Sequence, residues 1–178
     1  LFDDKLDAVF YNFPTVTVTL IVYGIAFILV EMRNKNTLRK KTQSLSRLTY
    51  KTAVIIGVFQ LLALIPGTSR SGATILGAIL IGCSREVAAE FSFFLAIPVM
   101  FGASLMKCAK FATEVTAGST VLGGTEIAIL FTGIIVSFIV SVIAIKFLMN
   151  YIKKNDFKFF GYYRIILGIV LIIYMIAK

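Results

Sequence analysis

Four apolar segments long enough to cross a lipid bilayer restrict what this chain can fold into. They cover residues 14–30, 87–111, 126–149 and 162–177. A bilayer core of about 30 Å needs roughly 20 apolar helical residues, whose backbone must satisfy its own hydrogen bonds. The chain is 58% hydrophobic and 15% charged, whereas a soluble domain is nearer a quarter charged. We therefore predict an all-α integral membrane protein, with one membrane domain over residues 1–178.

A fifth apolar segment, residues 52–83, is too long for one span and is broken in its middle. As continuous helix its 32 residues would extend about 48 Å at 1.5 Å per residue, well beyond a bilayer core. A string from Pro66 to Gly72 divides it into two halves that are each too short to cross. The segment is therefore either one broken span or a re-entrant helix–loop–helix hairpin.

The basic residues favour the hairpin. It places the loops at 31–51, 84–86 and 150–161 on one side of the membrane, where they hold eleven Lys and Arg against Lys5 in the opposite loops. A crossing segment would move the 150–161 loop to the other side. Because cytoplasmic loops are enriched in Lys and Arg, we predict that these three loops are cytoplasmic. Topology then accounts for the net charge of +9, and no nucleic-acid partner is expected.

Arg70 is the only charged residue between Lys51 and Arg85. A lone arginine at the centre of a spanning helix costs about 2.5–3.5 kcal/mol, so its surroundings must compensate. They are hydroxyls and glycines that let the backbone approach a ligand: Gly67, Thr68, Ser69, Ser71, Gly72 and Thr74. A guanidinium fork, hydroxyl donors and the N-terminus of the next half-helix suit phosphate oxygens.

We therefore predict an anion pocket in which Arg70 is the fork and Ser69, Ser71 and Thr74 are donors. The alternative is that Arg70 snorkels, or caps the carbonyls of a broken helix. The chain has no histidine, which removes the usual general base and metal ligand. Cys83 and Cys108 have no metal-like spacing and are expected to be small packing residues.

The string Pro66–Thr74, PGTSRSGAT, closely resembles the signature of the undecaprenyl-diphosphate phosphatases, also called bacitracin-resistance proteins. The spacing of Gly57, Gln60 and Ala63 before it, and the segment AEFSFFLAIP from Ala89 to Pro98 after it, resemble that family too. The resemblance covers essentially the whole chain, as the C-terminal two thirds of a family member. The chain does not resemble the acid-phosphatase type of lipid phosphatase, because the motifs of that type need histidines and this chain has none.

The resemblance implies a multi-pass enzyme of the bacterial cytoplasmic membrane, with a site that opens to the outer face. It would hydrolyse undecaprenyl diphosphate to undecaprenyl phosphate and inorganic phosphate. This reaction recycles the lipid carrier for peptidoglycan synthesis and gives bacitracin resistance. The implied fold is an inverted repeat with re-entrant hairpins. The implied partners are the polyprenyl diphosphate, membrane lipids and a second copy of the chain.

The resemblance also gives roles to residues. Arg70 would hold the diphosphate, and Ser69, Ser71 and Thr74 would contact phosphoryl oxygens, each a weaker candidate nucleophile because no local base activates it. Substrate-binding positions would be Gly67, Thr68, Gly72 and Gln60. Gln60 would orient a ligand or water, or tie the hairpin together. Glu90 would pair with Arg70 or hold the hairpin, rather than bind metal.

This chain departs from the family pattern in one respect. The family has an earlier motif, a glutamate pair followed by a Ser-Ser-Ser-Gly-His-like string, and the chain has nothing like it. That motif supplies the histidine base and the acidic ligands of a divalent cation, Mg or Ca, so no metal site is expected in this chain. The chain is either a fragment that lacks the N-terminal part of the same protein or an inactive remnant; we favour the fragment and expect the chain to be inactive alone.

Two other classes of protein fit the local chemistry. Broken helices whose N-termini face an anion at mid-membrane also occur in transporters, so an anion or lipid-phosphate transporter is the alternative function. A non-catalytic membrane subunit is the other. The specificity of the Pro66–Thr74 string favours the phosphatase.

Overall fold

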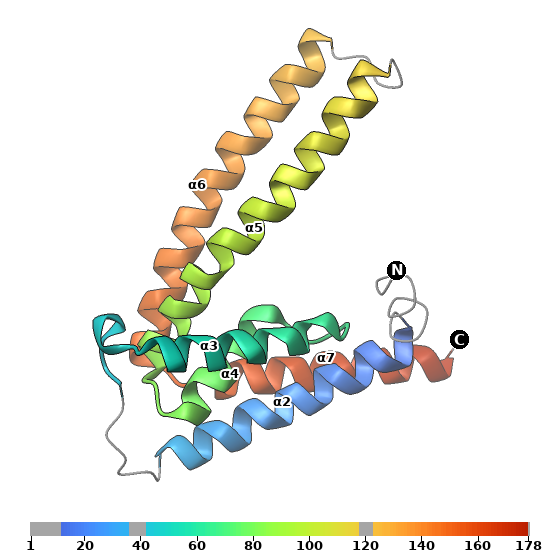
Figure 1. Ribbon diagram of the computed structural model, residues 1–178. Helices are drawn as coiled ribbons and strands as arrows, with labels where there is room; N and C mark the ends of the chain where they lie inside the picture. The colour runs from blue at the N-terminus through green and yellow to red at the C-terminus, as the bar shows by residue number, and fades with distance from the viewer. Residues whose placement is uncertain (1–11, 36–41, 118–122, 178) are drawn as a thin grey trace. The chain divides into compact units, whose positions relative to one another are not determined.

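The computed structural model describes residues 12–35, 42–117 and 123–177, and these residues are almost entirely helical (Figure 1). The helices are α2 (Phe13–Lys35), α3 (Tyr50–Gln60), α4 (Arg70–Ile81), α5 (Arg85–Thr116), α6 (Gly124–Lys154) and α7 (Lys158–Ala177), with short 3₁₀ turns at Leu45–Arg47 and Leu61–Leu64. No β-strand occurs among the described residues, so the predicted all-α class is confirmed. Arg39, Lys40 and Lys41 of the predicted 31–51 loop lie outside the described residues.

Four of these helices are long and apolar enough to cross a membrane. They are α5, α6, α7 and the Phe13–Arg33 part of α2. The apolar helices α3 and α4 have 11 and 12 residues, too few to span a core that needs about 20. These lengths and compositions are those of a multi-pass membrane protein.

The helices extend beyond the apolar segments that predict them. α2 continues to Lys35 and α6 to Lys154, and α7 already begins at Lys158, so the expected loop at 150–161 is a turn of three residues. Apolar composition predicts only the part of a helix that lies in the membrane core. The helix itself continues beyond that core for as long as its backbone hydrogen bonds remain favourable. Pro98, in the apolar segment 87–111, does not end a helix, because α5 passes through it as one helix. Neighbouring groups in membrane helices often tolerate such a proline.

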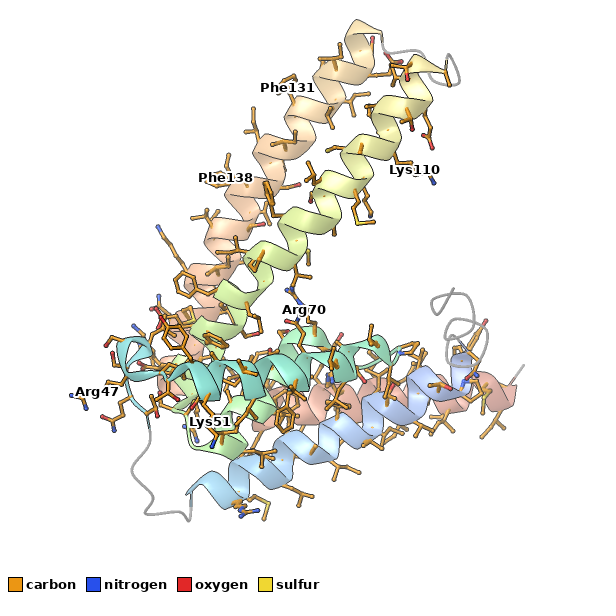
Figure 2. The ribbon with its side chains drawn as sticks, viewed as in Figure 1. Arg47, Lys51, Arg70, Lys110, Phe131 and Phe138 are labelled. Atoms are coloured by element: carbon orange, nitrogen blue, oxygen red, sulfur yellow. The ribbon has the colours of Figure 1, made fainter. Side chains whose placement is uncertain are left out.

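The described contacts divide the chain into two compact units. Unit 1 contains the residues up to Ser92 together with Ile152–Lys178, and unit 2 contains Phe93–Tyr151. In unit 2, the apolar face of α6 is exposed, with large side chains such as Phe131 and Phe138 standing off the helix (Figure 2). Exposure of this kind suits contact with lipid chains.

In unit 1, α2 packs along α7 through glycines. A Cβ at Gly24 would lie 2.9 Å from the carbonyl oxygen of Gly161, and a Cβ at Gly161 would lie 2.8 Å from that of Gly24. One heptad further along α7, a Cβ at Gly168 would meet the Ile21 side chain at 2.5 Å. Small residues let membrane helices approach closely, which strengthens van der Waals packing where no hydrophobic drive exists.

The helices α3 and α4 pack against each other as a hairpin within unit 1. Thr49 caps α3 by accepting from the Thr52 amide at 3.2 Å, and Gly82 ends α4 in the left-handed region with φ +108°. The Thr42 amide donates to the Gly82 carbonyl at 3.0 Å, and the Ser84 amide donates to the Thr42 carbonyl at 2.9 Å. The chain therefore enters α3 and leaves α4 at the same end of unit 1.

Candidate anion-binding site

The loop between α3 and α4 is held against α2 at its tip. Gly67 has φ +84°, a left-handed conformation that side chains with a Cβ rarely adopt. A Cβ there would overlap the Thr19 hydroxyl and lie 2.8 Å from the Val16 carbonyl oxygen. The Thr19 hydroxyl is 2.7 Å from the Pro66 carbonyl, to which it donates. The loop can therefore lie on α2 only because residue 67 is glycine.

Ser69 starts α4 as its N-cap. Its hydroxyl accepts from the Gly72 amide at 3.2 Å, and its carbonyl accepts from the Ala73 amide at 2.9 Å. The hydroxyls of Ser69 and Ser71 lie 3.1 Å apart. The first-turn amides of Arg70 and Ser71 have no acceptor within the helix. The end of α4 thus presents amide and hydroxyl donors together with the positive end of the helix dipole.

Two buried polar atoms in this loop have no hydrogen-bond partner. They are Nη1 of Arg70 and the hydroxyl of Thr68, a residue that is 8% exposed. Figure 2 shows Arg70 toward the tip of the hairpin, whereas Arg47 and Lys51 lie at its open end. A buried donor without an acceptor is costly, and a ligand with several acceptor oxygens would satisfy both.

Thr74 is in a different position from its neighbours. It is 1% exposed, and its hydroxyl lies 3.1 Å from the carbonyl oxygens of both Arg70 and Ser71. The same hydroxyl lies 2.7 Å from that of Ser92 on α5, which is 5% exposed. The Thr74 hydroxyl is therefore taken up within the protein, and its predicted contact with a phosphoryl oxygen stays a prediction.

Gln60 and Glu90 are the outlying members of the predicted site. Gln60 ends α3 and its side chain caps nothing in the following 3₁₀ turn. Glu90 lies on the first part of α5 and is half-buried. Among the described residues no ion pair joins Glu90 to Arg70, so the expected pairing is absent from this structure.

A buried ion pair forms elsewhere, at the open end of the hairpin. Glu31 of α2 is 1% exposed and accepts from the Arg85 guanidinium at the start of α5. Phe27 and Phe157 pack at the same end, with ring centroids 6.0 Å apart. These contacts gather the ends of α2, α5 and α7 beside the Thr42–Gly82 connection.

The depth of the loop follows from its contact with α2. Thr19, which holds the loop tip, and Glu31, at the open end, are 12 residues apart on one helix. At 1.5 Å per residue this is about 18 Å, more than half of a bilayer core of about 30 Å. The loop therefore lies about 18 Å along α2 from the open end of the hairpin.

Three contacts are not apparent from the sequence, because Thr19, Ser92 and Glu31 each bond to a residue far along the chain. The signals for them are weak: Thr19 is a polar residue in an apolar segment, Glu31 follows one, and Ser92 lies in the Ala89–Pro98 segment that resembles the family.

The described residues contain no group of three or more His, Cys, Asp or Glu that could hold a metal ion. The divalent cation that the resemblance implies, with ligands missing from this chain, stays a prediction.

Comparison with known proteins identifies what the chain is similar to. The family model described as bacitracin resistance protein BacA matches residues 1–170. The undecaprenyl-diphosphatase of Enterococcus faecalis is 67% identical over 173 residues, which are 97% of this chain and 61% of that protein. The undecaprenyl-diphosphatase of Acetivibrio thermocellus is 61% identical over 176 residues, which are 99% of this chain and 62% of that protein.

The chain thus spans about three fifths of the length of these curated relatives. These matches cover nearly all of this chain, and the interpretation of the chain as a fragment is not carried further.

Proposed function

Because the chain belongs to the bacitracin resistance protein BacA family, we propose that it acts in the hydrolysis of undecaprenyl diphosphate to undecaprenyl phosphate and inorganic phosphate. The observation that carries this proposal is the pair of unpartnered buried donors, Arg70 Nη1 and the Thr68 hydroxyl, at the N-terminus of α4. Relatives named undecaprenyl-diphosphatase supply the substrate class. A diphosphate offers the acceptor oxygens that these donors lack.

In this proposal the residues bind and polarise the diphosphate. The planar guanidinium of Arg70 donates hydrogen bonds to two phosphoryl oxygens at once. The ammonium group of a lysine lacks this bidentate geometry. The hydroxyls of Thr68, Ser69 and Ser71 and the first-turn amides of α4 donate to the remaining oxygens. Gly67 and Gly72 keep this surface open, and Gln60 orients a ligand or water. Donors fixed in advance around developing charge stabilise the transition state of phosphoryl transfer.

The membrane setting is part of the proposal. The α3–α4 hairpin enters from the cytoplasmic side and its loop faces a site that opens to the outer face of the cytoplasmic membrane. The common end of α3 and α4 at Thr42 and Gly82 supports this topology, as do the basic residues near that end. Inverted repeats, a second copy of the chain, and a divalent cation bound by acidic residues missing from this chain also stay proposals.

Arg70→Lys and Arg70→Ala test the site. We expect Arg70→Ala to lower phosphate release from undecaprenyl diphosphate about 10²–10³-fold, as for loss of one oxyanion donor. Arg70→Lys keeps the charge but loses the fork, and we expect at least about a tenfold loss. Binding of methylenediphosphonate, measured by calorimetry, should fall in parallel. Arg47→Lys, at an exposed arginine, is the control and should leave both unchanged.

The outcomes separate the proposed activity from its rivals. Near-normal phosphate release by the Arg70→Lys variant would contradict bidentate binding of the diphosphate by Arg70. Movement of the lipid across vesicles without phosphate release would indicate the transporter. Robust phosphate release by the wild-type chain would support the proposed hydrolysis, and diphosphonate binding without phosphate release would contradict it.

A further inference from the structure

Ser92 connects α5 to the first turn of α4, although it lies 18 residues from Thr74 in the chain. Both side chains are buried, at 5% and 1% exposure, and their hydroxyl oxygens are 2.7 Å apart. Thr74 lies in the turn that follows Arg70 and Ser71, so the contact reaches the backbone that carries the proposed anion site.

Counting protons relates the direction of this contact to the backbone bonds of Thr74. The Thr74 hydroxyl has one proton, and the carbonyl oxygens of Arg70 and Ser71, each 3.1 Å away, can only accept. If Thr74 donates to either carbonyl, Ser92 must supply the proton between the two hydroxyls. The chain of bonds then runs from Ser92 to Thr74 and on to the backbone of Arg70 or Ser71. In the reverse direction, Thr74 would donate to Ser92 and both carbonyls would lose its proton.

We propose that Ser92 is a positioning residue of the anion site and acts on Arg70 through Thr74. This inference rests on the proposed function, because Arg70 is the group being positioned. The hydroxyl pair links the first turn of α4 to α5, while the Thr19 bond to Pro66 holds the other side of the loop. The guanidinium is thereby presented from a backbone fixed on both sides, which lowers the ordering cost of ligand binding.

Ser92→Ala tests the proposal. One buried hydrogen bond corresponds to about a tenfold change in an equilibrium constant. We expect about tenfold weaker binding of methylenediphosphonate, and about tenfold faster amide hydrogen exchange in the first turn of α4, residues 71–75. Exchange in α2 and α7 should stay unchanged, which a loss of general stability would not allow. Ser104→Ala, at an exposed serine of the same helix, should change neither quantity by more than twofold.

A double-variant cycle with Thr74→Val tests whether Ser92 acts on Arg70 through the Thr74 hydroxyl. Because Ser92 acts through the Thr74 hydroxyl, Ser92→Ala should add less than twofold to the effects of Thr74→Val. Ser92→Thr keeps the hydroxyl and should restore binding to within about threefold of the wild type. If Ser92→Ala does not fold, Thr74→Ser and Thr74→Val replace it: Thr74→Ser keeps the bond to Ser92 and should bind at least about threefold more tightly than Thr74→Val.

Several results would overturn the role of Ser92. These are unchanged binding and exchange in Ser92→Ala, additive effects in the cycle, or equal affinities of Thr74→Ser and Thr74→Val. A wild-type chain that binds no diphosphonate would instead count against the proposed function, and the amide-exchange cycle would then decide whether Ser92 holds the turn.

Discussion

At the scale of single residues, the loop depends on one glycine and on the hydroxyls that surround it. Gly67 combines a left-handed backbone with contact to α2, so both its conformation and its missing Cβ are needed. Thr19 and Ser92 bind opposite sides of the loop from α2 and α5. Between them, Arg70 keeps a buried donor free of protein partners. A fixed backbone together with an unpartnered donor is what the proposed anion site requires.

Gly67→Ala should displace the loop. An alanine in the left-handed region costs about 1–2 kcal/mol, and overlap with Thr19 adds to it. We expect a lower thermal unfolding midpoint in detergent and at least tenfold weaker binding of methylenediphosphonate. Gly57→Ala is the matched control, since a Cβ at Gly57 meets nothing within 4 Å and alanine favours a helix by about 0.8–1 kcal/mol. Equal behaviour of the two variants would refute the role of Gly67.

At the scale of elements, the open end of the hairpin is stabilised by an ion pair between helices. Glu31 lies near the end of α2 and is almost completely buried, whereas Arg85 begins α5 and is 29% exposed. Oε2 of Glu31 and Nε of Arg85 are buried without a partner, so the pair depends on its single contact. Charges in such a site stabilise the fold only while both are present.

Glu31→Gln should destabilise unit 1. Removing one member of a buried pair leaves the other charge uncompensated, and we expect a loss of about 1–3 kcal/mol because Arg85 retains some access to water. Thermal unfolding in detergent measures it. Glu86→Gln, at an exposed glutamate beside Arg85, should have little effect. The double variant Glu31→Gln with Arg85→Gln should recover part of the loss, and a further loss would argue against the pair.

At the scale of the whole molecule, the central question is on which side of the membrane each connection lies. Hydrogen bonds join Thr42 to Gly82 and Ser84, and the Glu31–Arg85 pair lies at the same end of unit 1. In the proposed topology the basic segments before α3 and after α6 share this side. A broken span would separate them.

Cysteine labelling tests this arrangement. Ser46→Cys and Lys154→Cys should react with an impermeant maleimide from the same side of sealed vesicles, and Ala117→Cys from the other. Cys108 is replaced by serine. Cys83 should contribute little because burial raises the pKa of its thiol and keeps the reactive thiolate scarce. Labelling of positions 46 and 154 from opposite sides would indicate that the 52–83 segment crosses the membrane.

The sequence by itself determined the class of protein and indicated Arg70 as the centre of the proposed anion site. Apolar segments predict membrane helices because only apolar side chains are stable in the bilayer core. Arg70 indicates a functional site because a lone charge in an apolar segment is costly. Both signals are local and can be read from neighbouring residues. Helix ends are less predictable, because apolar composition indicates where the lipid core lies and not where the last backbone hydrogen bond of a helix forms.

Only the tertiary structure decided which polar residues support that site. Thr19, Glu31 and Ser92 bond to partners 47, 54 and 18 residues away. No pattern in the sequence specifies such pairs, because they arise where helices pack closely enough for short side chains to meet. Packing also separated Thr74, whose hydroxyl is engaged within the protein, from Arg70, whose Nη1 is not. Their places in one motif had suggested a shared role.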